Sequence, residues 1–294
     1  MEKVGYIGLG IMGRPAALNL VNAGYPLWVY ARRAPMMEPL TKAGATACDS
    51  SAKVAAESDI VFINVSDTHD VVEVTLGEHG IIEGIRPGSV VVDMSTISPS
   101  VTRTIAERLA EKDVHMLDAP VSGGEQGAID GTLSIMVGGK ADIFAQVKPL
   151  FDVMGKNIVH IGDHGAGQVT KSCNQVVIAQ AIAAIGEAYL LARASGVDPV
   201  KVREALMGGF AGSRVMESHG QRMLDRNFKP GFKAKLHYKD MRIVMEEAHK
   251  LGIALPGAAM VTQYLNALMN ADMGEDDSIS IYRLQERLSS MVDD

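Results

Sequence analysis

Lys171 stands near the start of a long helical pattern and is followed by uncharged residues as far as Gly186. A lysine placed there would be desolvated and would face the positive end of the helix dipole. Both effects lower the pKa of an amine toward a value suited to proton transfer. Asn174 shares a helix face with it and could orient a substrate or the lysine itself. The pattern predicts Lys171 as a general acid or base; the alternative is a lysine that extends to solvent.

A second group with chemical potential is Ser122-Gly123-Gly124, at the end of the segment Asp118–Gly124. This segment follows an apolar run, His115–Leu117, that reads as a strand. Successive backbone N–H groups and a hydroxyl beyond a strand can bind a carboxylate. The same residues also suit a purely structural turn, so the motif alone leaves both interpretations open.

A glycine-rich segment, Gly8-Leu9-Gly10-Ile11-Met12-Gly13, has the spacing of a dinucleotide-binding loop. The first glycine permits a tight turn, the second lets the backbone approach a pyrophosphate, and the third allows close packing of helix on strand. The helix N-terminus adds N–H donors and a positive dipole end. Glycines also mark ordinary turns, but a strand pattern precedes this loop and a helix pattern follows it. That context predicts a nicotinamide dinucleotide site.

The end of the second strand pattern, Val29-Tyr30-Ala31-Arg32-Arg33, bears on the choice of coenzyme. An acidic residue there would bind the free ribose 2′-hydroxyl of NAD, and none is present. A guanidinium can instead bind a 2′-phosphate with two parallel hydrogen bonds. We therefore expect NADP(H) to be favoured, with NAD(H) as the alternative. The competing interpretation is that Arg32 and Arg33 only solvate a loop.

A third group pairs the turn Phe228–Phe232 with the segment Leu236–Asp240, which contains a Lys–Asp step. Alone it is a weak indication of a segment that closes over a nicotinamide. The histidines His160, His164, His219 and His237 lack metal-ligand spacing, so no metal site is expected. Cys48 and Cys173 form no paired-cysteine motif, which fits a reduced cytoplasmic protein.

Composition narrows the class of protein. The chain has 294 residues, 47% of them hydrophobic and 21% charged, and a net charge of −7. That balance argues against a surface for nucleic acid or anionic membrane, although a pocket for a small anion is still allowed. The longest uncharged run, Leu251–Ala271, contains Pro256 and polar residues such as Asn266, so we expect a buried helix and no membrane span.

The elements that must position these residues fall into two halves. In the first half, short apolar runs alternate with helical patterns such as Gly13–Ala23 and Pro99–Lys112, which predicts a mostly parallel sheet covered on both faces. The predicted strands are Val4–Ile7, Leu27–Tyr30, Ile60–Val65, Val90–Met94, His115–Leu117, Ser134–Val137 and Asn157–Ile161. The fold class is therefore an α/β Rossmann-type dinucleotide-binding domain, over residues 1–163, followed by an all-α C-terminal domain.

The second half, residues 164–294, contains only helical patterns. The first, Gln168–Ser195, is a long interdomain helix whose middle, Val176–Ile185, is apolar on nearly every face. Such a helix must be buried in a domain core or against another subunit. The remaining predicted helices are Pro199–Leu206, Val215–Asp225, Tyr238–Leu251, Ala258–Asn270 and Ser278–Val292.

Taken together, these motifs resemble the β-hydroxyacid dehydrogenase family, in order and from end to end. The resemblance covers Gly5–Arg14, Val92–Ser95, Asp118–Gly124, Gly131–Gly139, Gly165–Asn174, Met207–Ser213 and Phe228–Asp240. Gly208–Ser213 and Asn227–Phe232 look like the branch that reduces tartronate semialdehyde to glycerate. The resemblance also implies a homodimer or homotetramer built through the helical domain, acting on a small carboxylate substrate.

The resemblance implies a role for individual residues as well. Lys171 would be the catalytic acid/base, Ser122, Gly123 and Gly124 would bind the substrate carboxylate, Asn174 would contact substrate, Val65 and Thr96 would line the coenzyme, and Lys239 would reach toward the nicotinamide. Many relatives have an asparagine where this chain has Gln175. That departure leaves open whether Asn174 or Gln175 touches the substrate.

Three other functions fit parts of the pattern. A 3-hydroxyisobutyrate dehydrogenase, or another 3-hydroxyacid dehydrogenase, would keep the chemistry and change the substrate. A non-catalytic NADP-binding protein would keep the fold, and an imine reductase would share the scaffold. Lys171 argues against a non-catalytic protein, as does the lack of any appended basic or reader segment. It also argues against an imine reductase, because the imine reductases that resemble this family generally replace that lysine.

Overall fold

A computed structural model describes residues 2–291 and divides the chain into two compact units, residues 1–171 and 172–294. The division lies within the long helix α9 (Ala166–Ala194), whereas the predicted boundary lies just before that helix begins. Val292, the predicted end of the last helix, lies outside the described residues. We describe the two units separately.

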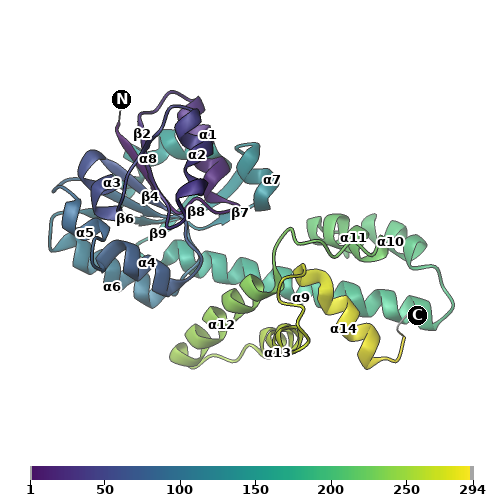
Figure 1. The fold of residues 1–294 in the computed structure, drawn as a ribbon. Coiled ribbons are helices and arrows are strands. Elements are labelled where there is room, and N and C mark those ends of the chain that lie inside the picture. Colours follow the sequence, from purple (N-terminus) through teal and green to yellow (C-terminus); the bar gives the residue numbers. More distant parts are fainter. Residues whose placement is uncertain (1, 292–294) are drawn as a thin grey trace. The chain divides into compact units, whose positions relative to one another are not determined.

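Unit 1 contains one twisted sheet with the strand order β3-β2-β1-β4-β5-β6-β8-β7, and β9 pairs with β8 (Figure 1). The strands β1 to β6 are parallel, and β8 runs antiparallel to both β6 and β7. The strands are β1 (Val4–Ile7), β2 (Leu27–Tyr30), β3 (Thr46–Ala47), β4 (Ile60–Ile63), β5 (Val90–Asp93), β6 (His115–Asp118), β7 (Val121–Ser122), β8 (Leu133–Gly139) and β9 (Gly155–Gly162). The predicted Rossmann-type fold is confirmed.

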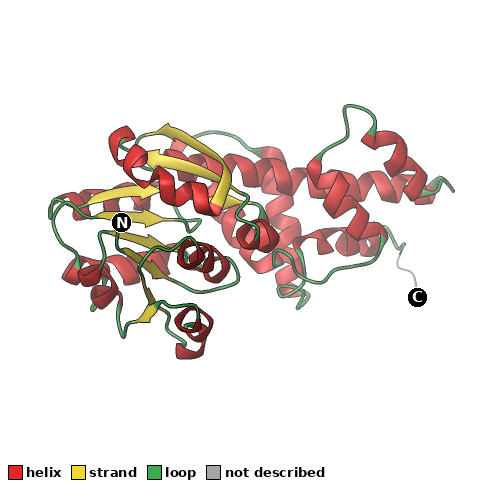
Figure 2. Cartoon of the chain, turned by 90° about the horizontal axis from the view of Figure 1, so that it is seen from above, coloured by secondary structure: helices red, strands yellow, loops and turns green. Residues whose placement is uncertain are grey.

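Helices cover both faces of this sheet (Figure 2). Because successive strand side chains point to opposite faces, Tyr6 and Phe62 lie in one core cluster while their neighbours Ile7 and Ile63 lie in the other. Burial on both faces explains why the strand patterns are apolar runs that lack alternation. The helices are α1 (Gly13–Asn22), η1 (Ala34–Met36), α2 (Glu38–Lys42), α3 (Ser51–Glu57), α4 (Thr68–Leu76), α5 (Ile81–Gly84), α6 (Pro99–Ala110), α7 (Gly124–Ile129) and α8 (Ala141–Met154).

Two strands were missed by the sequence patterns. Both β3 and β7 are only two residues long. A run of two residues carries no measurable periodicity, so only pairing with Leu27–Tyr30 and Leu133–Gly139 reveals them. The predicted strands that end at Val65 and Met94 stop earlier in the structure, at Ile63 and Asp93.

The described residues of unit 2 form helices joined by loops, and their one β-type pairing is an isolated bridge between Lys233 and Asp277. Its core is formed by the part of α9 after Lys171 and by the helices that gather around it (Figure 1). These are α10 (Pro199–Met207), η2 (Met216–Gly220), α11 (Gln221–Leu224), α12 (Ala234–Leu251), α13 (Pro256–Asn270), η3 (Ser278–Ser280) and α14 (Ile281–Leu288). The predicted all-α second domain is confirmed as a fold class.

Two predicted helices of unit 2 are each divided. The predicted Val215–Asp225 helix is a π-helical segment, η2, followed by one α-helical turn. The predicted helix from Ser278 begins with the 3₁₀ turn η3 and continues as α14. Sequence periodicity cannot distinguish these helix types, because the choice of hydrogen-bond partner depends on what packs against each turn.

Within this chain the domain core covers only part of the middle of α9, and burial of its other face against another subunit stays a prediction. Ala179, Ile182 and Ala183 are buried in the core of unit 2, but Val177 is exposed. By length and hydropathy alone α9 is also able to cross a membrane, and half of its most apolar window is buried within the protein. Core helices of soluble proteins commonly pass the same test, so the observation is weak evidence for a span.

Candidate active site

The strand order places the candidate coenzyme residues side by side. Because β1, β4 and β5 are adjacent and parallel, the segments that follow them meet at one edge of the sheet. The glycine loop, Val65 and Thr96 lie on these three segments. The order of connection reverses between β1 and β4, and such a switch point is where doubly wound sheets bind ligands.

The three glycines of the loop meet three different steric situations. Gly8 has φ +93°, and a Cβ on it would lie 2.2 Å from the backbone oxygen of Asn64. A Cβ at Gly13 would lie 2.0 Å from the oxygen of Gly8, so α1 packs too closely on the loop for any side chain there. A Cβ at Gly10 would meet nothing within 4 Å. A tight turn, an open approach and close helix packing are what a dinucleotide pyrophosphate requires, so the residues present fit that group.

Val65 and Thr96 are both half-buried, on segments held together by Ser95. The hydroxyl oxygen of Ser95 accepts a hydrogen bond from the backbone N–H of Val65, at 2.9 Å. The backbone N–H of Ser95 donates to the buried carboxylate of Asp93, also at 2.9 Å. The residue before Thr96 is therefore hydrogen-bonded to the segment that follows β4, which fixes the backbone position of Thr96.

The two arginines after β2 are both exposed. The Arg32 guanidinium lies 3.2 Å from the carboxylate of Asp70, which belongs to α4. A 2′-phosphate would have to share or displace this ion pair. The structure thus adds a carboxylate to the proposed phosphate site, which the sequence pattern after β2 could not show.

Ser122 ends the two-residue strand β7 and pairs with Ser134 of β8. Gly123 and Gly124 follow with φ values of +137° and +64°, and both are exposed. The angle at Gly123 is one that essentially only glycine adopts, and the left-handed angle at Gly124 also favours glycine. Pairing on β8 therefore fixes one end of this turn while its backbone is open to solvent, as a carboxylate-binding segment requires.

Lys171 is 8% exposed, although it carries an amine. The start of its helix is fastened to β6 by the carboxylate of Asp118, which accepts hydrogen bonds from the backbone N–H groups of Gly165 (2.8 Å) and Gln168 (2.9 Å). Burial raises the pKa of Asp118, and these two hydrogen bonds oppose that effect. The sequence patterns assign no individual role to Asp118 or Gln168, because the partners of both side chains lie far along the chain.

In unit 2, Asn174, Gln175, Lys239 and Asp240 form one connected group. Gln175 is 3% exposed and donates through Nε2 to the Asp240 carboxylate, at 2.6 Å. Lys239 pairs with the other oxygen of that carboxylate, at 2.9 Å. The half-buried Asn174 donates to the Gln175 side chain, at 2.9 Å. Gln175 is thus occupied by protein partners, whereas Asn174 is the more accessible of the two amides.

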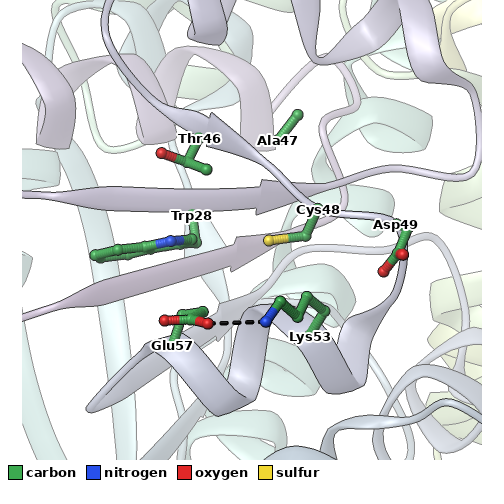
Figure 3. A pocket seen from close by; sticks show the side chains of 7 residues that line it. All are labelled: Trp28, Thr46, Ala47, Cys48, Asp49, Lys53 and Glu57. Atoms are coloured by element: carbon green, nitrogen blue, oxygen red, sulfur yellow. Dashed lines mark hydrogen bonds and ion pairs between the residues drawn. The ribbon is translucent and has the colours of Figure 1, made fainter.

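Two solvent-open hollows lie elsewhere in unit 1. One, of about 520 Å³, is lined by Trp28, Thr46, Ala47, Cys48, Asp49, Lys53 and Glu57 (Figure 3). Lys53 and Glu57 form an ion pair one turn apart along α3, at one side of this hollow. Burial raises the pKa of the Cys48 thiol, which opposes a nucleophilic role. The other, of about 480 Å³, is lined by Arg103, Ala106, Glu107, Ala110, Asp163 and His164. Neither lining includes the glycine loop or Lys171.

Within residues 2–291, one group of possible metal ligands comes close together: His69, Asp70 and Glu73. Two of these three side chains are exposed, and Asp70 already pairs with Arg32. We assign no metal to this group. Cys48 and Cys173 are both free thiols.

Two family models match the chain. The first describes the NAD-binding domain of 6-phosphogluconate dehydrogenase and matches residues 3–162. The second describes the NAD-binding region of NADP-dependent 3-hydroxyisobutyrate dehydrogenase and matches residues 165–285.

Individual relatives cover nearly the whole chain. A 2-hydroxy-3-oxopropionate reductase of Escherichia coli (strain K12) is 48% identical over 264 residues, which are 90% of each chain. A 2-(hydroxymethyl)glutarate dehydrogenase of Eubacterium barkeri is 34% identical over 98% of this chain and 96% of its own. Among solved structures, a Mycobacterium tuberculosis 3-hydroxyisobutyrate dehydrogenase with L-serine has a TM-score of 0.90 and 27% identity, covering 97% of this chain and 99% of its own.

Proposed function

The chain belongs to the β-hydroxyacid dehydrogenase family of NAD(P)-dependent oxidoreductases, and from this premise we propose that it reduces tartronate semialdehyde (2-hydroxy-3-oxopropionate) to glycerate. The observation that carries the chemical part of the proposal is the burial of Lys171 at the start of α9. The substrate part is supported by the relative that shares 48% of its residues with this chain.

The proposed roles follow from the local structure. The exposed N–H groups of the Ser122–Gly124 turn bind the substrate carboxylate. Lys171 donates a proton to the aldehyde oxygen as it gains negative charge, and in the reverse direction it accepts the proton of the alcohol. Asn174 orients the substrate, since Gln175 is bonded to Asp240. The nicotinamide supplies the hydride when it is bound.

The coenzyme would be held along the edge of the sheet. Gly8, Gly10 and Gly13 form the loop for the pyrophosphate, with the backbone of Leu9, Ile11 and Met12 completing it. Val65 and Thr96 line the site, and the role that the family resemblance implies for Lys239 is contact with the nicotinamide. Arg32 favours NADP(H) through its charge, and NAD(H) is the alternative because Asp70 already neutralises part of that charge.

The rival substrate is methylmalonate semialdehyde, the case of 3-hydroxyisobutyrate dehydrogenase, which has a methyl group where tartronate semialdehyde has a hydroxyl. The similarity to the mycobacterial structure keeps this rival open. A site that hydrogen-bonds a hydroxyl rejects the analogue that lacks it by orders of magnitude, whereas a methyl pocket discriminates weakly. A non-catalytic NADP-binding protein is the rival of another class.

The deciding experiment measures initial rates with both aldehydes, each with NADPH and with NADH. Selective turnover of tartronate semialdehyde supports the proposal. The ratio of the rates with NADPH and NADH tests the proposed contact of Arg32 with a 2′-phosphate. Turnover of methylmalonate semialdehyde alone would move the assignment to the rival substrate. Coenzyme binding without turnover of any 3-hydroxyacid or semialdehyde would support the non-catalytic alternative.

We further propose a cytoplasmic homodimer or homotetramer with no nucleic-acid or membrane partner.

A further inference from the structure

We propose that Gln168 is a positioning residue for Lys171, because its buried amide fixes the first turn of α9 against the segment that carries Thr96. The inference rests on the acid/base role proposed above for Lys171. It concerns a side chain that does not itself touch the reacting atoms.

The Gln168 side chain is fully buried, with 0% exposure, and both ends of its amide are used. Its Oε1 accepts a hydrogen bond from the backbone N–H of Ile97 at 3.1 Å, and its Nε2 donates to the backbone oxygen of Ser95 at 2.8 Å. These two backbone groups flank Thr96. One side chain therefore holds the main chain on both sides of the residue proposed to line the coenzyme.

The main chain of Gln168 is fixed as well. Its N–H donates to Asp118 at the end of β6, and the preceding residue, Gly167, lies against the sheet so closely that a Cβ there would be 2.3 Å from the oxygen of Met136. The first turn of α9 thus has contacts with β6, β8 and the segment after β5. Ser95 extends the same network to Val65 through its hydroxyl.

Lys171 follows Gln168 by three positions, which is one turn along the same face of the helix. Whatever fixes the first turn therefore fixes the Cα and Cβ of Lys171. A displacement of about 1 Å at a reacting group can cost about 100-fold in rate, so the accuracy of this turn matters. The network joins the helix of the proposed acid/base to the proposed coenzyme-lining segment, all within unit 1.

An amide is the side chain that this position requires, because it accepts and donates at once. A carboxylate at the same place accepts from Ile97 but cannot donate to Ser95. Burial raises the pKa of a carboxyl group, so a glutamic acid here becomes protonated as the pH falls and regains a donor. A methionine of similar length offers neither a comparable donor nor a comparable acceptor at any pH.

The test compares Gln168→Glu and Gln168→Met with the wild-type enzyme across a range of pH. We expect kcat to fall by about 10- to 100-fold in both variants at neutral pH. The KM for coenzyme should change less than kcat, because the hydrogen bonds of Ser95 to Asp93 and Val65 still hold the segment of Thr96. The ratio of kcat in Gln168→Glu to kcat in the wild type should rise as the pH falls. The same ratio for Gln168→Met should not depend on pH.

The matched control is Gln285→Glu in unit 2. Gln285 is also a buried glutamine whose Nε2 donates to a backbone oxygen, that of Ala183 at 3.0 Å. The substitution makes the same buried change, so it should lower the Tm to a similar degree and leave kcat unchanged. An equal loss of kcat in Gln285→Glu would overturn the inference, since the effect would then be general destabilisation.

Amide hydrogen exchange over residues 165–172 separates this inference from the proposed function. Faster exchange in Gln168→Met than in wild type, confined to this turn, supports the positioning role. If the wild type reduces no aldehyde, the proposed function fails and exchange alone decides the inference. Unchanged exchange overturns it in that case, as does an unchanged kcat when the wild type is active.

Discussion

Lys171 is the residue whose surroundings most constrain the chemistry of this chain. A nearly buried amine is costly unless neighbouring groups or a function require it. Its place at the start of α9 is fixed by Asp118 and Gln168, which both belong to unit 1. A flexible surface lysine would have no such support, and the side chain is therefore poorly explained as one that extends to solvent.

We expect Lys171→Ala to lower kcat by about 10²- to 10⁴-fold, the usual contribution of a general acid or base. Coenzyme binding, measured by NADPH fluorescence, should persist, because the glycine loop is intact. Lys148→Ala is the control, since Lys148 lies on the surface of α8 in an ion pair with Asp152. A Lys171→Ala enzyme with wild-type kcat would contradict the proposed role.

The proposed role of Arg32 in coenzyme preference is tested at the same scale. Removing a guanidinium that binds a phosphate costs about 1.5–3 kcal/mol, so Arg32→Ala should raise the KM for NADPH by roughly tenfold or more. The KM for NADH should stay the same. Asp70→Asn should lower the KM for NADPH, because it removes the carboxylate that pairs with Arg32. A parallel change for both coenzymes would argue that Arg32 only solvates the loop.

At the scale of elements, the turn from β1 into α1 gives a matched pair of variants. In Gly13→Ala the new methyl would lie 2.0 Å from the oxygen of Gly8, so α1 must shift. We expect a loss of about 1–3 kcal/mol in unfolding free energy, as for other overpacked positions, together with weak coenzyme binding. Gly10→Ala meets open space and should keep the wild-type Tm while it weakens coenzyme binding. Thermal unfolding and a fluorescence titration measure the two effects, and equal coenzyme affinity in Gly10→Ala and wild type would count against the pyrophosphate site.

The π-helical segment η2 contains a half-buried histidine, His219. Burial lowers the pKa of His219, and the nearby Asp277 carboxylate partly offsets that effect. The unfolded chain therefore takes up the proton first, so stability should be lost as the pH falls from about 6.5 through the lowered folded pKa.

His219→Gln removes this dependence because glutamine does not titrate. Its Tm should fall less than that of the wild type between neutral pH and mild acid, by a difference of a few degrees at most. His69→Gln, an exposed position on α4, serves as the control and should retain the wild-type slope. Identical slopes for all three proteins would show that His219 does not contribute.

At the scale of the whole molecule, one apolar face of α9 is exposed to solvent, and this face bears on how subunits assemble. Val177, Ala184 and Leu191 are all exposed and lie seven residues apart, so they form one stripe along the helix. Val177 and Leu191 are 66% and 70% exposed. Apolar stripes of this kind commonly mark subunit interfaces, which fits the proposed homodimer or homotetramer.

The double variant Val177→Glu, Leu191→Glu should lower the molecular mass measured by light scattering and leave the helical circular dichroism signal intact. Charges in an apolar interface are costly to bury, whereas they cost little on a surface exposed to water. Val159→Glu, at an exposed apolar position on β9, is the control and should keep the wild-type mass. An unchanged mass in the double variant would place the interface elsewhere.

Local sequence patterns were sufficient to predict the fold class, and they also selected the glycine loop and Lys171 as the proposed site residues. Strand–helix alternation and the position of three glycines depend on neighbours a few residues away, so they can be read without the fold. The family resemblance added the expected roles of Ser122 and Asn174. The expected coenzyme preference rested on Arg32, Arg33 and the absence of an acidic residue after the second strand, and only the structure revealed the ion pair between Arg32 and Asp70.

The tertiary structure decided everything that depends on pairing across long separations. Strands β3 and β7 exist because neighbouring strands hydrogen-bond to them, and their own residues carry no period. Gln168 bonds to Ser95 and Gln175 bonds to Asp240, in each case across more than sixty residues of chain. Such partners are fixed by how the elements pack, which a local pattern does not encode. The sequence therefore selects Lys171 as the proposed acid/base, and the packed structure determines which side chains hold it in place.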